Sequence, residues 1–343
     1  MPMKNYLYFS LILCLFWSCD SQRQKKPEVS AEIVFDEQVA KELSSVKWRK
    51  TRLKQATILA LAETPSGNLL AGTPEGLFYS SDDGVSWKIV SDQTLSSNQV
   101  NCLVSDDKYT YAGISLNGVY RSSDNGASWT RLSQGLQPAL IGVKDLMIHQ
   151  GKIYAGTTNG VFMSMDSAHT WLPANKGVPL SPPRGEPIAR HLHIHSLING
   201  GDKIYALTEQ GVLISSDQGV NWTLSKAKEL EPYVVSSLLC VDESIYVGRH
   251  FQEGVYKSTD GGLSWKNAGL EGNNLQKMLL SRNGLIYAGT NGQGVFRTVD
   301  HGKTWTELNK GLPTGAVVSS FINTRAGTIL VGIENHGIYR LRD

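Results

Sequence analysis

Alternating histidines are the first residues in this sequence that could do chemistry. His191, His193 and His195 take every second position in the stretch RHLHIHSL, so in a strand they would point to one side. Two histidines at positions i and i+2 can share a metal ion such as zinc. No carboxylate or cysteine completes the set in sequence. We therefore expect hydrogen-bonding histidines, with no metal and no cofactor.

Six aspartates recur in a unit of the form Ser-x-Asp-x-Gly-x-Ser/Thr-Trp, clearest in SSDDGVSW, SSDNGASW and STDGGLSW. Successive copies are 42, 42, 51, 43 and 40 residues apart, and the aspartates are Asp82, Asp124, Asp166, Asp217, Asp260 and Asp300. Carboxylates can bind calcium or catalyse hydrolysis, but each of these lies in a separate turn, so we interpret them as structural. Such an aspartate accepts hydrogen bonds from backbone N–H groups that follow it, and the glycine adopts a positive φ. Ala168 replaces that glycine in the third copy, which predicts a looser turn or a turn of different geometry.

The elements that position these residues follow from the stretches before each unit. IYAGTTNGVFMS and IYAGTNGQGVFRT alternate with a period of two and contain a glycine turn, which predicts two strands each time. The tryptophan that ends each unit begins a further strand and should pack between neighbouring sheets. Sheets repeating about every 40 residues are typical of β-propeller blades.

The two ends of the chain complement one another. SVKWRK, at residues 45–50, has the end of the unit without its beginning, whereas the C-terminal GIYRLRD stops at Asp343, 43 residues after Asp300. Trp48 would therefore supply the last blade with its fourth strand, which closes the ring and removes exposed sheet edges. The sequence predicts an all-β, seven-bladed β-propeller over residues 45–343, closed by an N-terminal strand paired with the C-terminal blade. One tryptophan falls to each blade: Trp48, Trp87, Trp129, Trp171, Trp222, Trp265 and Trp305.

These units resemble the Asp-box, or BNR, repeats of sialidases, sortilin-type receptors, xyloglucanases and photosystem II stability/assembly factor-like proteins. The resemblance covers about residues 45–343, and KGLP at residues 310–313 is similar to the last of these groups. It implies that the Asp-boxes join the third and fourth strands of each blade, away from the usual binding face. It also implies assistance to the assembly or stability of a partner complex.

The N-terminal segment resembles a bacterial lipoprotein signal. One positive charge precedes the apolar run YLYFSLILCLFW, and FWSC ends in Cys19, which would be lipidated. Phe16 and Trp17 depart from the usual pattern, so an ordinary cleaved signal is the alternative. We expect a signal at residues 1–19, a flexible tether at 20–44, and an exported protein held on a membrane of the bacterial cell envelope by its lipid anchor.

Composition excludes some partners and leaves others open. The net charge is +2 with no basic stripe in the repeats, so we expect no nucleic acid, and we expect a monomer. Export would permit a disulfide, but Cys102 and Cys240 fall three blades apart by the repeat count. We interpret both as small buried side chains.

Function is expected on the face opposite the Asp-boxes, which we call the top face. It is formed by the turns between second and third strands and by the connections from one blade to the next. A long insertion, Leu172 to Leu197, lies in one such connection; it is either a binding element or a tolerated insertion. Aligning Leu197 with Leu103 and Leu146 places His195 beside Asn101 and Lys144, near the channel. The candidate binding residues are His193, His195, Arg249, His250, Glu253, Asn335 and His336.

Enzymatic alternatives lack their motifs. A sialidase needs an arginine triad, and although Arg184, Arg190 and Arg249 fall in top-face segments, the Phe-Arg-Ile-Pro motif is absent. A xyloglucanase-like glycosidase needs two suitably placed carboxylates, and Glu186, Glu253 and Glu334 match no such motif. We therefore expect a non-catalytic propeller that binds a protein or glycan, with a glycoside hydrolase as the alternative.

Overall fold

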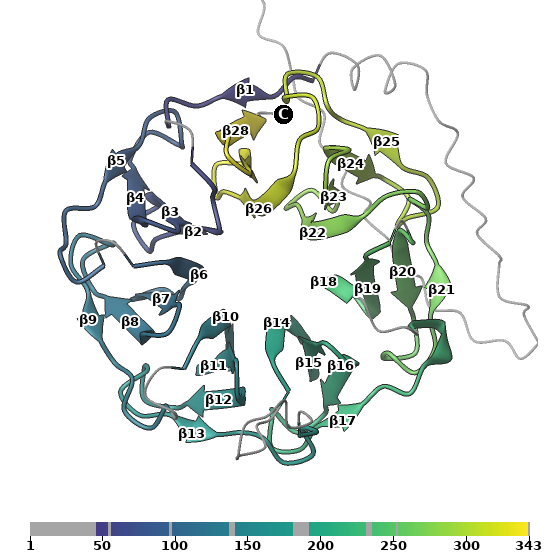
Figure 1. Cartoon of the computed structure of the whole chain (residues 1–343), viewed down its shortest axis with the longest axis horizontal. Coiled ribbons are helices and arrows are strands. Elements are labelled where there is room, and N and C mark those ends of the chain that lie inside the picture. Colours follow the sequence, from purple (N-terminus) through teal and green to yellow (C-terminus); the bar gives the residue numbers. More distant parts are fainter. Residues whose placement is uncertain are drawn as a thin grey trace, which may run out of the picture. The chain divides into compact units, whose positions relative to one another are not determined.

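The computed structural model describes residues 46–53, 56–95, 98–136, 141–180, 192–230, 235–251 and 253–341. These residues form seven four-stranded antiparallel sheets arranged as the blades of a ring (Figure 1). The predicted seven-bladed β-propeller is thus confirmed. The predicted signal, tether and Cys19 lie outside the described residues, as do His191 and Asp343. No helix among the described residues is long and apolar enough to cross a membrane.

Each blade runs from an innermost first strand to an outermost fourth strand. The first strands are β2 (Ala60–Glu63), β6 (Val100–Ser105), β10 (Val143–His149), β14 (Ile194–Gly200), β18 (Val235–Val241), β22 (Leu275–Leu280) and β26 (Val318–Asn323). The second strands are β3 (Leu69–Thr73), β7 (Thr110–Ile114), β11 (Lys152–Thr157), β15 (Lys203–Thr208), β19 (Ser244–Arg249), β23 (Ile286–Thr290) and β27 (Ile329–Ile333).

The outer strands are shorter. The third strands are β4 (Gly76–Ser80), β8 (Gly118–Ser122), β12 (Gly160–Ser164), β16 (Gly211–Ser215), β20 (Val255–Ser258), β24 (Val295–Thr298) and β28 (Gly337–Leu341). The fourth strands are β5 (Lys88–Ile89), β9 (Thr130–Arg131), β13 (Leu172–Pro173), β17 (Thr223–Leu224), β21 (Lys266–Asn267), β25 (Thr306–Glu307) and, from the other end of the chain, β1 (Arg49–Lys50). One 3-10 turn, Lys228–Leu230, precedes β18. We number the blades 1 to 7 from β2.

The ring closes as the complementary ends predict. β1 pairs antiparallel with β28, with Arg49 opposite Arg340 and Lys50 opposite Tyr339. The ring of Trp48 is buried, and its Nε1 donates to the carbonyl oxygen of Leu308 at 2.7 Å. Trp171 and Trp222 make the same kind of bond to the preceding blade, to Leu132 and Ala174 at 2.9 Å. Trp48 therefore serves blade 7 as Trp171 and Trp222 serve blades 3 and 4.

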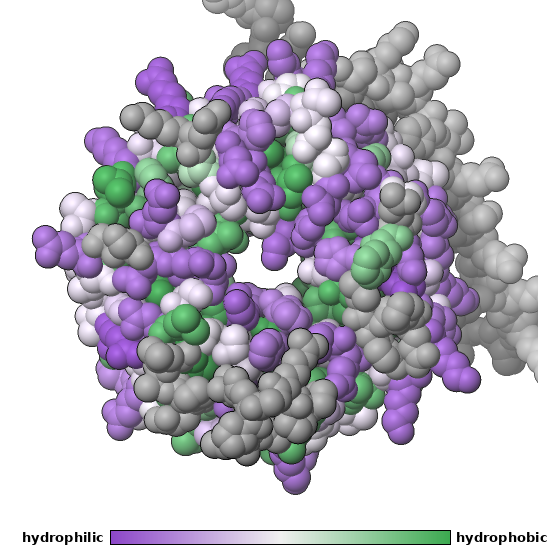
Figure 2. Space-filling view, in the orientation of Figure 1, coloured by the Kyte–Doolittle hydropathy of each residue, from purple (hydrophilic) through white to green (hydrophobic). Residues whose placement is uncertain are grey.

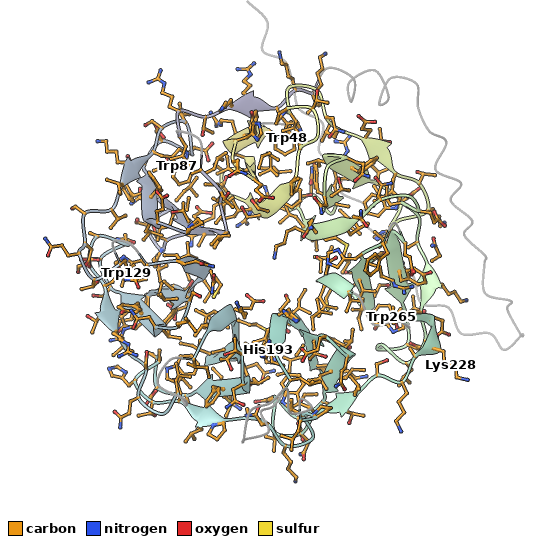
Figure 3. All side chains as sticks on the ribbon, in the orientation of Figure 1. Trp48, Trp87, Trp129, His193, Lys228 and Trp265 are labelled. Atoms are coloured by element: carbon orange, nitrogen blue, oxygen red, sulfur yellow. The ribbon has the colours of Figure 1, made fainter. Side chains whose placement is uncertain are left out.

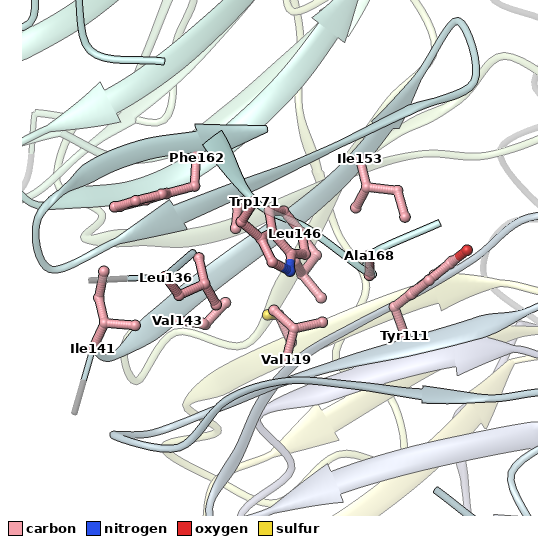
Figure 4. Packing of buried hydrophobic residues seen from close by; sticks show 12 residues of the cluster. Tyr111, Val119, Leu136, Ile141, Val143, Leu146, Ile153, Phe162, Ala168 and Trp171 are labelled. Carbon is pink, nitrogen blue, oxygen red and sulfur yellow. The ribbon is translucent and has the colours of Figure 1, made fainter. Parts of the chain in front are cut away.

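The core consists of apolar layers between adjacent blades, not of one central mass. In the layer between blades 2 and 3, Trp171 packs with Val119 and Leu146 (Figure 4). The labelled tryptophans lie toward the outer half of the ring (Figure 3). Cys102 is buried and Cys240 is only partly buried, so the prediction of burial holds fully for the first alone; both are free thiols.

A glycine in the second strand sets how closely neighbouring blades approach. A Cβ on Gly156 would lie 2.7 Å from Cγ2 of Ile194, the first residue of the next inner strand. Gly72 and Gly289 likewise face Val100 and Val318. No side chain fits in that space without displacing its neighbour.

The Asp-box turns are built as the sequence indicates, except that the turn at Ala168 keeps the common geometry. Asp124 Oδ1 accepts the backbone N–H of Ser128 at 2.9 Å, and Oδ2 accepts its hydroxyl at 2.6 Å. The accepted N–H thus belongs to the residue four positions after the aspartate. All six aspartates accept this backbone hydrogen bond and a second one from the side chain of the same residue. The expectation of a looser turn at Ala168 is wrong. Ala168 takes φ +71, and Thr170 N donates to Asp166 at 2.9 Å, because the surrounding bonds impose the geometry.

Candidate functional site

The top face carries the turns between second and third strands and the connections between blades. Seen down the ring axis, the space-filling view shows an opening through the centre, bordered mainly by hydrophilic side chains (Figure 2). The Asp-box turns join third to fourth strands, at the opposite ends of those strands. Polar side chains that surround the opening, and turns that stand beside it, are therefore the groups that a ligand on this face can meet.

His193 and His195 lie at the beginning of β14, next to the channel. Both are exposed, their ring centroids are 6.5 Å apart, and the rings are nearly perpendicular. His193 is labelled on the inner side of blade 4 (Figure 3). Glu209, in the next turn of the same blade, places Oε2 3.7 Å from His195 Nε2. Burial lowers the pKa of His195 despite the nearby Glu209 carboxylate, so the ring is neutral at pH 7.

Arg249, at the end of β19, is fixed inside blade 5. Its side chain is buried (3% exposed), forms an ion pair with Glu253, and donates to the carbonyl oxygen of Glu229 at 3.1 Å. Its guanidinium carbon lies 4.9 Å from the centre of the Tyr256 ring. These contacts hold the turn between β19 and β20 in place. His250 follows Arg249 in that turn, and partial burial lowers the pKa of its imidazole.

Asn335 and His336 lie in the turn of blade 7. Asn335 has φ +58 and exchanges hydrogen bonds with Thr57, its backbone N–H lying 3.3 Å from Thr57 Oγ1. His336 Nδ1 lies 2.8 Å from the carbonyl oxygen of Glu334. The candidate residues thus form three groups, on blades 4, 5 and 7. Among the described residues, no hydrogen bond or ion pair joins one of these groups to another.

Two exposed apolar residues on the top face were not predicted from the sequence. Phe251 is 72% exposed and Leu116 is 57% exposed, and each stands at the tip of a turn between second and third strands. Both have a positive φ, +58 and +59. A bulky side chain in this region is strained, whereas glycine or asparagine is not. An apolar residue inside an otherwise polar glycine-bounded turn is the signal that could have found them.

A ring of β-bulges surrounds the channel. The first strands of blades 2 to 7 each contain a register shift at their second residue. The residues at the shift are Asn101, Lys144, His195, Ser236, Gln276 and Ser319. His195, Asn101 and Lys144 therefore occupy equivalent positions, as the leucine alignment predicts. Inner-strand side chains extend into the opening (Figure 3). Bulges re-aim side chains and are frequent beside functional sites.

Asp145, the residue after the bulge in β10, links blades 3 and 4. Its Oδ2 accepts the N–H of Leu197 at 2.8 Å and the hydroxyl of Ser196 at 3.0 Å. Burial raises the pKa of its carboxyl, and the hydrogen bond from the Leu197 N–H and the charge of Lys277 oppose that rise.

The arrangement offers binding groups more readily than metal ligands. Over the described ranges, no three histidine, cysteine, aspartate or glutamate side chains gather as a metal site would require. Two of the top-face carboxylates face a partner in their own blade: Glu209 faces His195, and Glu253 faces Arg249. What the face presents is a polar channel mouth and exposed apolar turn tips.

Comparison with known proteins supports the fold. No protein-family model matches the chain, and no curated protein matches its sequence. Among solved structures it is similar to the extracellular domain of the hybrid two-component system BT4673 from B. thetaiotaomicron (16% identity, TM-score 0.68). That match covers 87% of this chain and 40% of the other, so this chain spans less than half of that protein's length.

Two further structures are similar over nearly the same part of the chain. YCF48 from Cyanidioschyzon merolae matches with 12% identity and a TM-score of 0.66, covering 86% of this chain and 99% of that one. The GH74 xyloglucanase from Xanthomonas campestris matches with 15% identity and a TM-score of 0.60, covering 86% and 53%. At these identities the likeness shows a shared β-propeller fold and no more.

Proposed function

We propose that this chain is a non-catalytic binding propeller of the bacterial cell envelope that recognises a protein or glycan through its top face. The observation that carries the proposal is the pair of strained, exposed turn tips, Phe251 and Leu116. Strain at a solvent-exposed position lowers stability without any gain in packing. We therefore infer that these two side chains contact a partner outside the molecule.

The rigidity of the face favours binding as well. Arg249 and Glu253 hold the turn that displays Phe251, and Thr57 holds the turn of Asn335. Side chains held in place lose less entropy when a partner binds. His193, His195, His250 and His336 stand on the same face and would supply polar contacts around the apolar tips.

The similar structures are compatible with this role. YCF48 has also been solved bound to D1 peptide, with 12% identity and a TM-score of 0.67 to this chain. A propeller of this shape can therefore bind a polypeptide, and we extend that to this chain as assistance to the assembly or stability of a partner. The BT4673 match is an extracellular domain. This supports export of this chain, and we further propose lipidation at Cys19 and attachment to a membrane by that anchor alone.

Capture from native envelopes tests the proposal. The full-length protein is compared with Phe251→Ser/Leu116→Ser and with a matched control, Val220→Ser/Leu263→Ser, whose exposed residues (55% and 73%) lie in Asp-box turns on the opposite face. Any captured protein or glycan is then purified and titrated against all three proteins. We expect the top-face variant to bind at least tenfold more weakly and the control to bind as the unchanged protein does. Equal binding by all three would refute a top-face site.

The same preparation addresses the glycoside hydrolase alternative. Release of reducing sugars from xyloglucan or sialylated glycans by the unchanged protein would show an enzyme. We expect none above the background of the Glu253→Gln and Glu209→Gln variants.

A further inference from the structure

We propose that the Asp-box face of the propeller rests on the lipid surface to which the protein is anchored, through exposed apolar side chains in the turns of blades 3 to 6. The inference rests on the proposed lipidation of Cys19. It concerns the face opposite the proposed partner site, so the two faces of the ring would make two different contacts.

The chain joins the propeller at the Asp-box face. SVKW of blade 7 aligns with GVNW at the end of the Asp-box of blade 4, so Val46 corresponds to Val220 and Trp48 to Trp222. The two indoles agree, since each donates Nε1 to a carbonyl oxygen of the preceding blade, at 2.7 and 2.9 Å. β1 follows on the outer rim between β25 and β5 (Figure 1). Val46 therefore stands where other blades have their Asp-box turns, and the segment that connects Cys19 to the propeller joins it there.

Four consecutive blades each expose one large apolar side chain in the Asp-box turn. Val220 (55%) and Leu263 (73%) follow the turn glycine in blades 4 and 5. Met165 (62%) and Val299 (37%) precede the aspartate in blades 3 and 6, where the other copies have serine or threonine. We call these four residues the apolar band. Exposed apolar side chains gathered on one face are typical of a surface that contacts protein or membrane.

The charges around the apolar band do not favour an anionic surface. Asp202, Asp242 and Glu243 are exposed in the turns between first and second strands of blades 4 and 5, whereas Arg282 and Lys303 are exposed on blade 6. The Asp-box carboxylates add further negative charge. Attraction of basic residues to anionic lipids therefore does not supply this contact. Burial of apolar side chains is what the face offers.

The Asp-box carboxylates limit the depth of the contact. Asp217 accepts the N–H and the side-chain amide of Asn221 at 2.8 and 2.6 Å, and these bonds lower its pKa to about 2. A carboxylate that is charged at pH 7 does not enter hydrocarbon. The apolar band therefore reaches only the boundary between head groups and acyl chains, as an amphipathic helix lying on a membrane does. Zwitterionic head groups carry an ammonium that can face the carboxylates.

The anchor favours lipid over a second protein as the occupant of this face. A stable protein interface needs a continuous, well-packed apolar core, but the apolar band comes from separate turns with charged residues between them. Such a weak contact becomes effective when a covalent link keeps the two surfaces at high local concentration. A lipid on Cys19 provides that link to a membrane.

The test uses the full-length lipidated protein in phosphatidylcholine vesicles, with the lipid on Cys19 verified by mass spectrometry. A fluorophore is attached at Thr259→Cys, in the Asp-box turn of blade 5, or at Glu75→Cys, in the top-face turn of blade 1; both positions are exposed. Cys102→Ala and Cys240→Ala remove the free thiols of the propeller. Lipids that carry a nitroxide near the head group quench a fluorophore that lies at the membrane surface.

Two variants separate the apolar band from apolar exposure in general. The control changes the top-face tips, Leu116→Ser/Phe251→Ser. The band variant changes all four residues of the apolar band, Met165→Ser/Val220→Ser/Leu263→Ser/Val299→Ser. Thermal melts check that each variant is folded, and light scattering in detergent measures whether two copies associate.

We expect the nitroxide lipid to quench the fluorophore at residue 259 about twofold or more above that at residue 75, because only the Asp-box face meets the head groups. The band variant should lose this difference and the top-face control should keep it. High salt should leave the quenching unchanged, since an apolar contact is not screened.

Equal quenching at the two positions, or an unchanged difference in the band variant, overturns the inference. Quenching that requires phosphatidylglycerol and disappears in high salt overturns the apolar contact, and a dimer that the band variant abolishes assigns the face to a second copy. If Cys19 carries no lipid, the inference fails together with the anchor. If Cys19 is lipidated and quenching is equal, this inference fails alone, and partner capture by the top face stands.

Discussion

Asp83 and Arg340 are 257 residues apart in the sequence, yet Arg340 Nη2 lies 2.8 Å from Asp83 Oδ2. Asp83 belongs to the first Asp-box turn, in blade 1, and Arg340 to β28 in blade 7. The hydroxyl of Thr328 donates to the same carboxylate oxygen. The ring is thus closed by the pairing of β1 with β28 and also by polar contacts between its first and last blades, of which this is one.

Loss of this contact should weaken the closed ring. Arg340→Met leaves the partly buried Asp83 carboxylate without its cation and should lower the free energy of unfolding by about 1–3 kcal/mol. Arg325→Met is the comparison, because Arg325 also joins blade 7 to blade 1 but is more exposed, lying 3.8 Å from Glu63 and donating to the carbonyl oxygen of Pro65 at 2.9 Å. It should cost about 0–1 kcal/mol. Urea unfolding measures both. Equal losses would show that the Asp83 contact adds no more to closure than the exposed contact of Arg325.

The Asp-boxes should make stability fall in acid. Bonds from the Thr170 hydroxyl and N–H lower the pKa of Asp166 from 3.8 to about 2. The side chain and N–H of Asn221 lower that of Asp217 similarly. Because the folded pKa lies below the unfolded one, this stabilisation is present above pH 4 and is lost between pH 4 and 2. Melting temperatures across that range check it, and Asp166→Asn/Asp217→Asn should flatten the decline.

Substitutions on the top face should affect binding, whereas substitutions in the Asp-boxes should affect stability. His195→Ala/His250→Ala should weaken partner binding and leave the melting temperature nearly unchanged, because both rings are at least partly exposed. Asp124→Ala should do the reverse, since its carboxylate accepts bonds from Ser122 and Ser128 within one turn. A loss of binding with unchanged stability in Asp124→Ala would show that the partner binds the Asp-box face and not the top face.

Relief of strain at Phe251 should stabilise the protein at the expense of binding. Asparagine accepts the φ of +58 found there, as Asn335 does in blade 7. Phe251→Asn should raise the free energy of unfolding by about 1 kcal/mol, since strain of this kind costs about 1–3 kcal/mol. Leu263→Asn, at an exposed position without a positive φ, should give no such gain. A Phe251→Asn protein that is less stable would show that the ring packs usefully where it is.

Anchoring is tested at Cys19. Cys19→Ala should abolish incorporation of labelled fatty acid and release the protein from the membrane fraction. Membrane association through a single acyl chain is marginal and a diacylated anchor is stable. Labelling that persists in Cys19→Ala would rule out the lipoprotein assignment.

The repeated unit made the fold predictable, since strand alternation, turn residues and tryptophans recur at one period in every blade. Ring closure followed because SVKWRK and GIYRLRD are two parts of one unit. The geometry at Ala168 did not follow, because Ser164 and Asp166 impose a turn that alanine disfavours when alone.

The site was less predictable for related reasons. A β-bulge adds one residue to a strand, and the alternating pattern conceals it, so a residue's direction changes without any change in composition. The sequence placed Arg249 among exposed binding residues, but its side chain is buried and pairs with Glu253 through a turn that only the structure reveals. Phe251 was overlooked because strain is a property of φ and not of residue type.

Completion of blade 7 by β1 has a consequence for folding order. During synthesis β1 emerges first and its partner β28 last, so this sheet cannot form until almost the whole chain has been made. Blades 1 to 6 are each contiguous in the chain and can assemble in turn, while contacts as distant as Trp48 with Leu308, 260 residues apart, come late. The same sheet should then be the first to separate when the ring opens. Loss of β1 near one end of the chain, or of β28 near the other, would disrupt the whole last blade, and not merely its edge.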